Sequence, residues 1–471
     1  MYVNGEWILS NSGEYFTVNN PSTKEVVAKV PKANAEETKA AITGASDALK
    51  KWSLLTAEQR AKYMLKLRDL MLEYTEELAT IMSMEMGKAY NEAKGEVVYA
   101  ASFLTWYAEE GKRIYGETIP ASAENKRLFV IKQPVGVVAA ITPWNFPLAM
   151  MTRKLGPAMA AGCTGIVKPA SQTPLTALAF AKLADMAEIP KGVINIVAGS
   201  TKAISDELFN NSAIKKISFT GSTNVGKELV RQSANQLKKL SLELGGHAPY
   251  IVFEDADIEK AVEGVVASKF RNAGQTCVCA NRIYVHKNIK EEFAKLFVEK
   301  VKELKVGNSL AEGVDIGPLV NESGLEKVKE HVEDAVEKGA KVLYGGAEVK
   351  DASGYFYIPT ILDNVTEEMK IMQEETFGPV APITIFETDD KAIDAANNTE
   401  YGLASYIYTK DISRAVKASE ALNFGIVGLN DAMPGVAQAP FGGMKESGYG
   451  REGGHQGIRD YLEEKYISLG L

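Results

Sequence analysis

Two of the chain's three cysteines, Cys277 and Cys279, are one residue apart in the stretch "FRNAGQTCVCANR". Ligand pairs in zinc sites are spaced more widely than Cys-Val-Cys, and the four histidines are scattered, so we predict no metal centre. Three cysteines in 471 residues do not make a disulfide framework. A thiol in a polar loop is therefore a candidate nucleophile, with an inert buried cysteine as the alternative. Cys163, in "AAGCTGIV", fits that alternative better.

The loop that holds the cysteine pair follows residues 258–270, whose apolar side chains recur at helical spacing. We predict a helix there that Gly274 ends, which places Cys277 beyond a helix C-terminus. The helix dipole disfavours a thiolate at that end. A base, a cation or oriented amides must therefore activate the thiol.

A carboxylate and an amide elsewhere in the sequence could assist such a thiol. In "KKLSLELGGHAP", polar residues alternate with leucines, so Glu243 points away from the leucine face of a strand, and two glycines follow it. A partly desolvated acid there would have a raised pKa and could act as a general base, with a solvated surface residue as the alternative. In "ITPWNFPLAM", prolines and aromatics hold Asn145, which suits an oxyanion donor or a turn-stabilising residue.

Two strand ends could bind a nucleotide. In "KISFTGSTNVGKELVRQ" an apolar strand ends at Phe219 and a helix starts near Thr223, so free amides and the helix dipole would favour a pyrophosphate. A plain capped turn is the alternative. In "IVKPASQTP", Lys168 could hydrogen-bond ribose hydroxyls. The G-x-G-x-x-G string at residues 448–453 lacks the strand and helix of the dinucleotide fingerprint, and we interpret it as a decoy.

The bulk composition is that of an ordinary globular protein, with 45% hydrophobic and 24% charged residues. A net charge of -8 disfavours nucleic acid and anionic membranes as partners. The N-terminus lacks a signal-peptide pattern, and the most apolar stretch, residues 135–151, is too short and proline-rich to span a bilayer. We therefore predict a soluble cytoplasmic protein.

The hydrophobic pattern divides the chain into helical and alternating parts. Residues 35–112 favour several helices, with Thr56 as a candidate N-cap, and a hairpin follows. Short apolar strands then alternate with helices in two blocks that meet at Gly245-Gly246, which predicts parallel sheets with crossover helices. The last residues, "RDYLEEKYISLGL", favour a strand that either joins another subunit's sheet or forms a local edge.

Six motifs together resemble the aldehyde dehydrogenase superfamily: "TPWNFP", "FTGST", "LELGG", "GQTC", "EETFGPV" and "PFGG". They occur in the family's order across nearly the whole chain, and "FRNAGQTCVCANR" and "PWNFPLAMMTRK" are similar to the succinate-semialdehyde dehydrogenase branch. The resemblance implies an α/β fold with a Rossmann-like cofactor domain (residues 1–114 and 134–244), an α/β catalytic domain (245–440) and a small β oligomerisation arm (115–133 and 441–471). It also implies a homodimer or homotetramer.

The resemblance implies covalent catalysis without a metal. Cys277 would attack the aldehyde, and the Asn145 side chain and the Cys277 amide would hold the oxyanion. A nicotinamide cofactor would take a hydride, and Glu243 would activate water to hydrolyse the thioester. The resemblance implies two roles for Lys168, one among the catalytic residues and one in binding the cofactor. The implied cofactor contacts are Trp144, Lys168, Ser171, Gly221, Ser222, Glu375 and Phe377.

Cofactor and substrate preference depend on single positions in this resemblance. Members that prefer NAD usually carry Glu where this chain has Ser171, so we predict that NADP is accepted and favoured over NAD. Arg153 and Arg271 match the branch's pair that binds a substrate carboxylate, with structural ion pairing as the alternative. Gly435 stands where the branch usually has a serine, which removes one contact to succinate semialdehyde.

Two further expectations follow from the resemblance. Ser205 replaces the second glycine of a helix-start loop after Gly199, which would keep that loop farther from the cofactor. Cys279 is either a packing residue or a redox partner of Cys277.

A broad-specificity aldehyde dehydrogenase, an acylating enzyme and a non-catalytic binding protein on the same fold remain as alternatives. Intact Cys277 and Glu243 argue against the last two.

Overall fold

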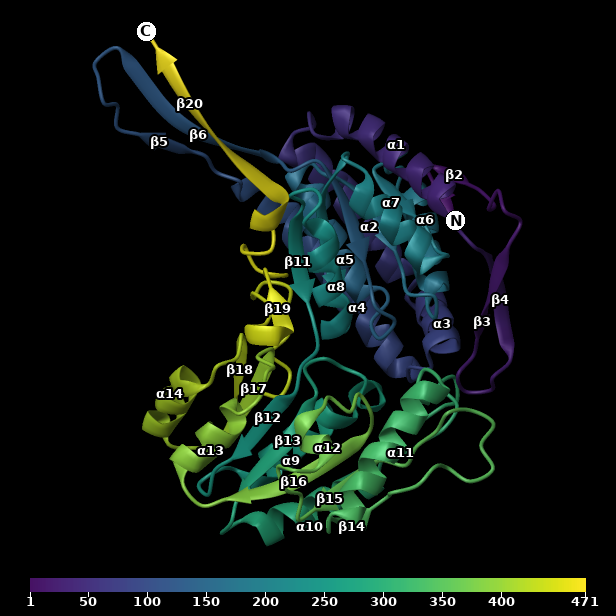
Figure 1. Cartoon of the computed structure of the whole chain (residues 1–471), viewed down its shortest axis with the longest axis vertical. Helices are drawn as coiled ribbons and strands as arrows, with labels where there is room; N and C mark the ends of the chain where they lie inside the picture. The colour runs from purple at the N-terminus through teal and green to yellow at the C-terminus, as the bar shows by residue number, and fades with distance from the viewer.

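The computed structural model describes residues 1–471. Figure 1 shows two α/β bodies, one above the other, and an arm that projects from the upper body and carries the C-terminus. The upper body contains an eight-stranded sheet and the lower body a seven-stranded sheet. No helix combines the length and apolar character needed to cross a bilayer.

The upper sheet has the order β19-β11-β10-β7-β8-β9-β1-β2, with a parallel centre and antiparallel edges. Its strands are β1 (Tyr2–Val3), β2 (Glu6–Trp7), β7 (Val137–Ile141), β8 (Thr164–Lys168), β9 (Ile194–Ile196), β10 (Ile214–Thr220), β11 (Lys239–Glu243) and β19 (Gly448–Tyr449). All residues of β7 and β8 are buried, because helices cover both faces of the sheet.

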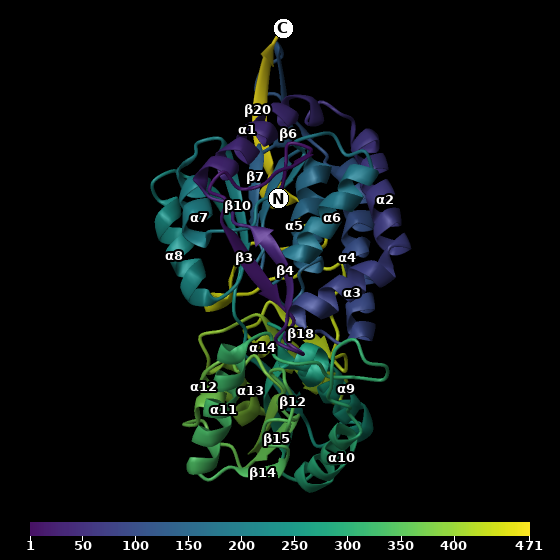
Figure 2. The same cartoon turned by 90° about the vertical axis from the view of Figure 1, so that its right-hand side faces the viewer.

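Figure 2 shows two layers of helices, with α7 and α8 beside the sheet on one side and α2 to α6 on the other, while α1 packs against α7. Their bounds are α1 (Ala35–Trp52), α2 (Ala57–Glu73), α3 (Thr75–Met86), α4 (Tyr90–Glu110), α5 (Ala149–Ala161), α6 (Pro174–Met186), α7 (Thr201–Asn210) and α8 (Thr223–Ser233). The predicted cap at Thr56 is confirmed, since its side chain and that of Gln59 form a reciprocal capping box. A separate hairpin, β3 (Tyr15–Asn19) and β4 (Val26–Pro31), precedes α1.

The lower sheet has the order β14-β15-β16-β13-β12-β17-β18 and is parallel except at β14. Its strands are β12 (Ala248–Val252), β13 (Ala280–His286), β14 (Lys341–Tyr344), β15 (Thr360–Asp363), β16 (Val380–Phe386), β17 (Ala404–Tyr408) and β18 (Ile426–Leu429). Its helices are α9 (Ile258–Phe270), α10 (Lys290–Lys302), α11 (Glu322–Glu337), α12 (Lys370–Gln373), α13 (Asp389–Asn397) and α14 (Ile412–Ala421). The parallel strands predicted for both blocks are confirmed.

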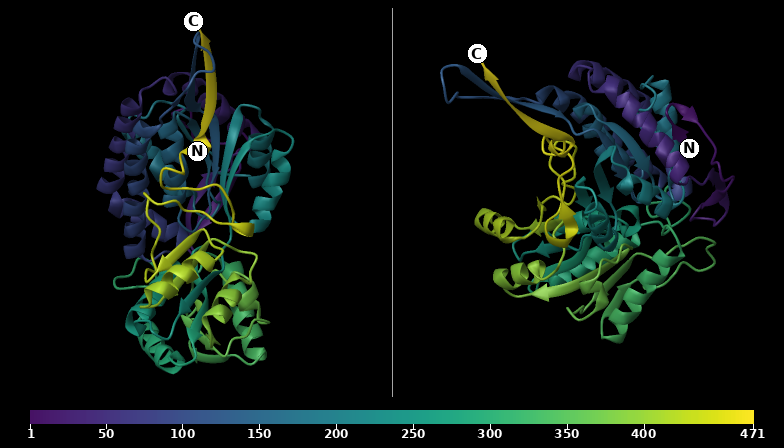
Figure 3. Two further views of the ribbon diagram at one scale, coloured as in Figure 1. Left: turned by 90° about the vertical axis from the view of Figure 1, so that its left-hand side faces the viewer. Right: turned by 45° about the horizontal axis from the view of Figure 1, so that its top comes forward.

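The arm is a three-stranded antiparallel sheet of β5 (Glu117–Ile119), β6 (Lys126–Pro134) and β20 (Leu462–Gly470). Of the two expectations for the C-terminal strand, the local one holds within this chain, because β20 pairs with β6 along its whole length. The predicted arm segment, residues 441–471, includes residues that belong to the upper body; of these residues only β20 pairs with the arm. Its β19 pairs with β11 of the upper sheet, and Figure 3 shows the C-terminal segment passing both bodies before it reaches the arm.

Candidate active site

The thiol loop begins where α9 ends, at Phe270. The prediction that Gly274 ends this helix was wrong by four residues, because the backbone turns left-handed at Asn272 (φ 52°), Ala273 (φ 55°) and Gly274 (φ 73°). Left-handed residues with side chains cost about 1–3 kcal/mol each, so packing must hold this turn in place. A side chain at Gly274 would lie 2.1 Å from the Gly378 carbonyl oxygen, which explains why a glycine is needed there.

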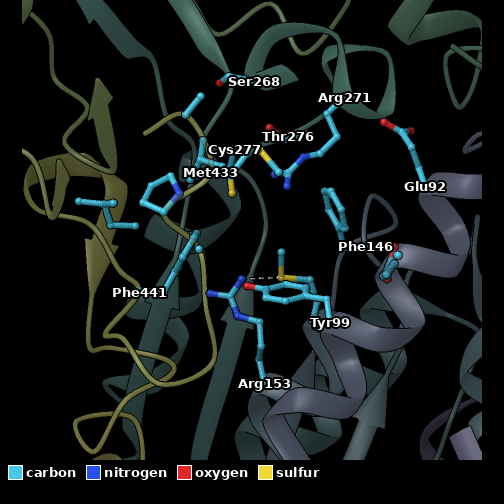
Figure 4. Close-up of a pocket in the computed structure, with 18 of the residues that line it drawn as sticks. Glu92, Tyr99, Phe146, Arg153, Ser268, Arg271, Thr276, Cys277, Met433 and Phe441 are labelled. Atoms are coloured by element: carbon cyan, nitrogen blue, oxygen red, sulfur yellow. Dashed lines mark hydrogen bonds between the residues drawn. The ribbon is translucent and has the colours of Figure 1, made fainter. Parts of the chain in front are cut away.

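Cys277 lines a cavity of about 330 Å³, together with Arg153, Arg271, Tyr99 and Gly435. Figure 4 shows its sulfur pointing into this cavity, with Arg271 reaching in from one side and Tyr99 and Arg153 on the other. Burial raises the pKa of the Cys277 thiol to about 12, and the Arg153 charge opposes that rise. The thiol is therefore protonated at neutral pH and must lose its proton to a base before it attacks.

Glu243 is the last residue of β11 and is 3% exposed. Burial, followed by the charge of Glu452, raises its pKa well above the usual range. The following glycines let the two sheets approach each other, since a side chain at Gly246 would lie 2.2 Å from the Cys277 carbonyl oxygen. Gly442, in "PFGG", likewise leaves room for the carboxylate of Glu243, whose Oε1 would lie 2.9 Å from a side-chain carbon there.

Asn145 lies between the two bodies and is 4% exposed. Its Nδ2 donates a hydrogen bond to the Gln275 carbonyl at 3.1 Å, which leaves its second hydrogen free. Its backbone carbonyl accepts hydrogen bonds from Lys88 Nζ at 2.9 Å and Asn272 Nδ2 at 3.0 Å. The amide is therefore fixed against the thiol loop, as an oxyanion donor requires.

A buried ion pair between Lys88 and Glu96 supports Asn145, because Lys88 also bonds to the Asn145 backbone carbonyl. Oε1 of Glu96 accepts the backbone N–H groups of Leu148 and Ala149 at 3.0 and 3.1 Å, at the start of α5. Lys88 also lies over the ring of Phe146, 3.6 Å from its centroid. Sequence reasoning missed this pair, because nothing in the spacing of Lys88 and Glu96 shows that both are buried.

The two arginines predicted to bind a carboxylate have different surroundings. Nε of Arg153 lies 2.8 Å from Glu452, and its guanidinium lies over Phe441 at 3.9 Å. Glu452 also pairs with buried Lys154, so one carboxylate faces two cations. Arg271 forms no ion pair, and its buried Nε has no hydrogen-bond partner. Its guanidinium lies over the Phe146 ring, 5.3 Å from the centroid, and the Glu92 carboxyl lines the same cavity without forming an ion pair with it.

Glu452 belongs to the G-x-G-x-x-G string interpreted as a decoy. The interpretation agrees with the structure in that β19 lies at a sheet edge and no α-helix follows the glycines, only a short 3-10 helix at Arg459–Tyr461. The buried charge within the string was missed, although an isolated Glu in a glycine-rich turn is a signal that sequence analysis could have used.

The predicted cofactor residues occupy the ends of neighbouring strands. Lys168 ends β8, and its buried Nζ bonds only to the Pro169 carbonyl at 3.3 Å, so it retains free donors for a ribose. Burial lowers its pKa to about 8. Ser171 lies three residues beyond β8. Gly221 follows β10 directly, and Ser222 caps the N-terminus of α8 by accepting the Val225 N–H.

The other predicted cofactor contacts come from both bodies: Glu375 and Phe377 precede β16 of the lower sheet, and Trp144 follows β7 of the upper sheet. Oε1 of Glu375 accepts the Gly246 N–H at 3.2 Å, and burial raises the pKa of this carboxyl to about 7. The rings of Phe377 and Trp144 meet edge-on, 5.4 Å apart. A buried amine with free donors and a capped helix N-terminus fit a nicotinamide dinucleotide. The expectation for Ser205 was wrong, because α7 already starts at Thr201 and Ser205 lies within it.

Residues 7–467 match the profile of the aldehyde dehydrogenase family. The chain belongs to the aldehyde dehydrogenase family. The NADP-dependent succinate-semialdehyde dehydrogenase of Escherichia coli strain K12 is 54% identical over 469 residues, covering 100% of this chain and 97% of that protein. A glutarate-semialdehyde dehydrogenase of Pseudomonas putida is 53% identical over 470 residues, covering 100% and 97%.

Solved structures agree with this assignment. The crystal structure of an NADP-dependent enzyme of E. coli matches with a TM-score of 0.98 and 54% identity, covering 100% of this chain and 98% of that one. The predicted aldehyde dehydrogenase fold is thus confirmed, and this aldehyde dehydrogenase is an enzyme that oxidises aldehydes with a nicotinamide cofactor.

Proposed function

We propose that this enzyme oxidises succinate semialdehyde to succinate with NADP⁺ as the favoured cofactor. The observation that carries the proposal is Arg271, a guanidinium without an ion-pair partner in a largely apolar cavity that is also lined by the Cys277 thiol, by Phe146 under the guanidinium and by one nearby carboxylate, Glu92. A buried unpaired charge is costly, so a cavity with a free cation favours an anionic ligand. The relatedness to the E. coli succinate-semialdehyde dehydrogenase supports the same substrate.

In the proposed mechanism Cys277 loses its proton to a base and its sulfur bonds to the aldehyde carbon. The second Nδ2 hydrogen of Asn145 and the Cys277 N–H hold the oxyanion as it forms. The nicotinamide supplies a hydride acceptor when bound, held by Lys168, Glu375 and Phe377. Glu243 then takes a proton from water, which attacks the thioester carbon, so that the carboxylate leaves and the thiol is restored.

A panel of aldehydes tests the proposal. We expect kcat/KM, followed through NADPH absorbance, to be about 100-fold higher for succinate semialdehyde than for butanal, because a charge-assisted contact at Arg271 contributes about 1.5–3 kcal/mol. Equal values for the two aldehydes would contradict the carboxylate assignment and favour the broad-specificity alternative, which the missing serine at Gly435 supports. Absence of turnover with every aldehyde would favour a non-catalytic binding protein, and a strict need for coenzyme A would favour an acylating enzyme.

Ser171→Glu should reverse the cofactor preference. A carboxylate beside the 2′-phosphate of NADP⁺ costs several kcal/mol, so kcat/KM for NADP⁺ should fall by about 100-fold or more, while NAD⁺ is spared. Ser171→Ala is the matched control, since it removes the hydroxyl without adding charge and should cost about 10-fold. A wild-type enzyme that strongly prefers NAD⁺ and gains nothing from Ser171→Glu would reject the assignment.

Of the two roles expected for Cys279, we propose packing. Its buried thiol faces the Lys269 carbonyl at 3.4 Å, on the α9 side of the loop, and Cys279 does not line the cavity that Cys277 enters. Cys279→Ala should therefore be inactivated by peroxide at the wild-type rate, and dithiothreitol should restore neither enzyme. Recovery of the wild type alone would instead support a protective disulfide with Cys277.

The arm supports a proposed homodimer or homotetramer. Tyr466 and Leu469 are 57% and 47% exposed on β20 of the sheet that projects from the upper body, and Leu471, which follows the strand, is 71% exposed. A projecting sheet with apolar side chains and open edges favours pairing with another copy.

A further inference from the structure

One carboxylate of the cavity wall binds the backbone of the thiol loop. Both side-chain oxygens of Glu92 accept the N–H of Asn272, each at 3.0 Å. Glu92 belongs to α4 of the upper body, whereas Asn272 follows α9 of the lower body. Figure 4 shows Glu92 on its helix, facing the segment that carries Arg271. A charge-assisted hydrogen bond therefore joins the two bodies beside the cavity.

The residue that Glu92 holds begins the left-handed turn of the thiol loop. Asn272 and Ala273 have φ angles of 52° and 55°, a conformation that strains any residue with a side chain. Asn272 is also buried, so its N–H would lack an acceptor without the carboxylate, which costs free energy. Glu92 thus stabilises the turn at the point where its backbone is strained.

Asn272 connects this turn to the oxyanion donor and to the thiol. Its Nδ2 donates to the backbone carbonyl of Asn145 at 3.0 Å and to that of Gln275 at 3.2 Å. Nδ2 of Asn145 donates to the same Gln275 carbonyl at 3.1 Å. Gln275 lies two residues before Cys277. The place of Asn272 therefore fixes the Asn145 amide relative to the Cys277 thiol.

The same face of α4 also contacts the loop that contains Asn145. Glu92 and Glu96 are one helical turn apart, so their side chains lie on one face. Glu96 accepts the backbone N–H groups at the start of α5 and pairs with Lys88, which donates to the Asn145 carbonyl. One helix face thus binds both the loop of the oxyanion donor and the loop of the thiol.

We propose that Glu92 is a positioning residue, which holds the left-handed turn at Asn272 and thereby sets the Cys277 thiol against the Asn145 amide. Glu92 takes no part in the covalent steps, and it acts in the same way whether or not the aldehyde carries a carboxylate. This inference rests on the proposed function, because it takes Cys277 as the nucleophile and Asn145 as the oxyanion donor.

The experiment measures NADPH formation in a single turnover, with enzyme in excess over succinate semialdehyde or butanal, and the steady-state KM for each. Glu92→Ala should slow the single turnover by about 100-fold with both aldehydes, because a displacement of about 1 Å between reacting groups costs that factor. KM should stay within about threefold of the wild-type value, since substrate binding is spared.

Two further variants calibrate this loss. Glu92→Gln keeps an acceptor oxygen without the charge, so it should lose only about 10-fold. Glu109→Ala removes an exposed carboxylate from the other end of α4 and should behave as the wild type. Circular dichroism compares the folds, and Glu92→Gln carries the test if Glu92→Ala unfolds.

Ala273→Gly separates positioning from an effect of charge. Glycine adopts the left-handed backbone without strain, so its addition to Glu92→Ala should raise the single-turnover rate by about fivefold. An influence of the Glu92 charge on Arg271 would gain nothing from this glycine.

Three results would overturn the inference and leave the proposed function intact. They are a wild-type single-turnover rate in a folded Glu92→Ala or Glu92→Gln enzyme, a loss confined to succinate semialdehyde, and a failure of Ala273→Gly to recover any of the rate. Substantial turnover by Cys277→Ala would instead overturn the proposed mechanism itself.

Discussion

Cys277→Ala is expected to lower the rate of aldehyde oxidation by about a million-fold, the largest effect of any single substitution in this enzyme. Every later step depends on the covalent adduct, because the hydride leaves easily only from a carbon that already carries an oxyanion and a sulfur. NADPH absorbance under saturating succinate semialdehyde measures the loss. Cofactor affinity, followed by fluorescence, should stay near the wild-type value, since Cys277 is not among the predicted cofactor contacts.

Cys279→Ala is the matched control, since it removes a neighbouring thiol from the same loop. It should retain most of the activity, with a small loss of stability from the cavity left beside α9. Substantial turnover by Cys277→Ala, or loss of activity in Cys279→Ala with an intact fold by circular dichroism, would contradict the assignment of the nucleophile.

Glu243→Gln should separate the two halves of the reaction. Acylation of Cys277 can proceed once, so NADPH should appear as a burst close to one equivalent per active site. Steady-state turnover should then fall by about 100- to 10,000-fold, because no base activates the water. Rapid-mixing absorbance measures the burst, and mass spectrometry should detect the acyl group on Cys277.

The pH profile provides an independent check of the same residue. A general base works in its deprotonated form, and burial with the charge of Glu452 raises the pKa of Glu243. The steady-state rate of the wild type should therefore rise with pH through that raised pKa, and Glu243→Gln should lack this rise. A variant with no burst, or with an unchanged pH profile, would assign the base to another group.

The sequence was informative where chemistry requires particular residues in a fixed order. Alternation around Glu243 and the apolar runs that became β7, β8 and β10 predicted buried parallel strands, and the structure has them. The Thr56 cap was predicted for the same reason, because its capping box is local in sequence. Motif order identified the family that the profile match confirms.

The features that were missed depend on long-range packing. Lys88 and Glu96 become a buried pair only when the residues before and within α4 pack against the start of α5. Glu452 gains two cationic partners from α5, about 300 residues earlier in the chain. The end of α9 was misplaced because the left-handed turn at Asn272 and Ala273 is held by contacts that no local pattern records.

The proposed base ends a strand of the upper sheet, whereas the thiol follows a helix of the lower body, and the bare backbone of Gly246 lets the thiol loop lie close to the end of that strand. Catalysis thus depends on the contact between the upper and the lower body, because each body supplies a different part of the site. We therefore expect mild denaturant that separates the two bodies to abolish activity even while each sheet keeps its own hydrogen bonds.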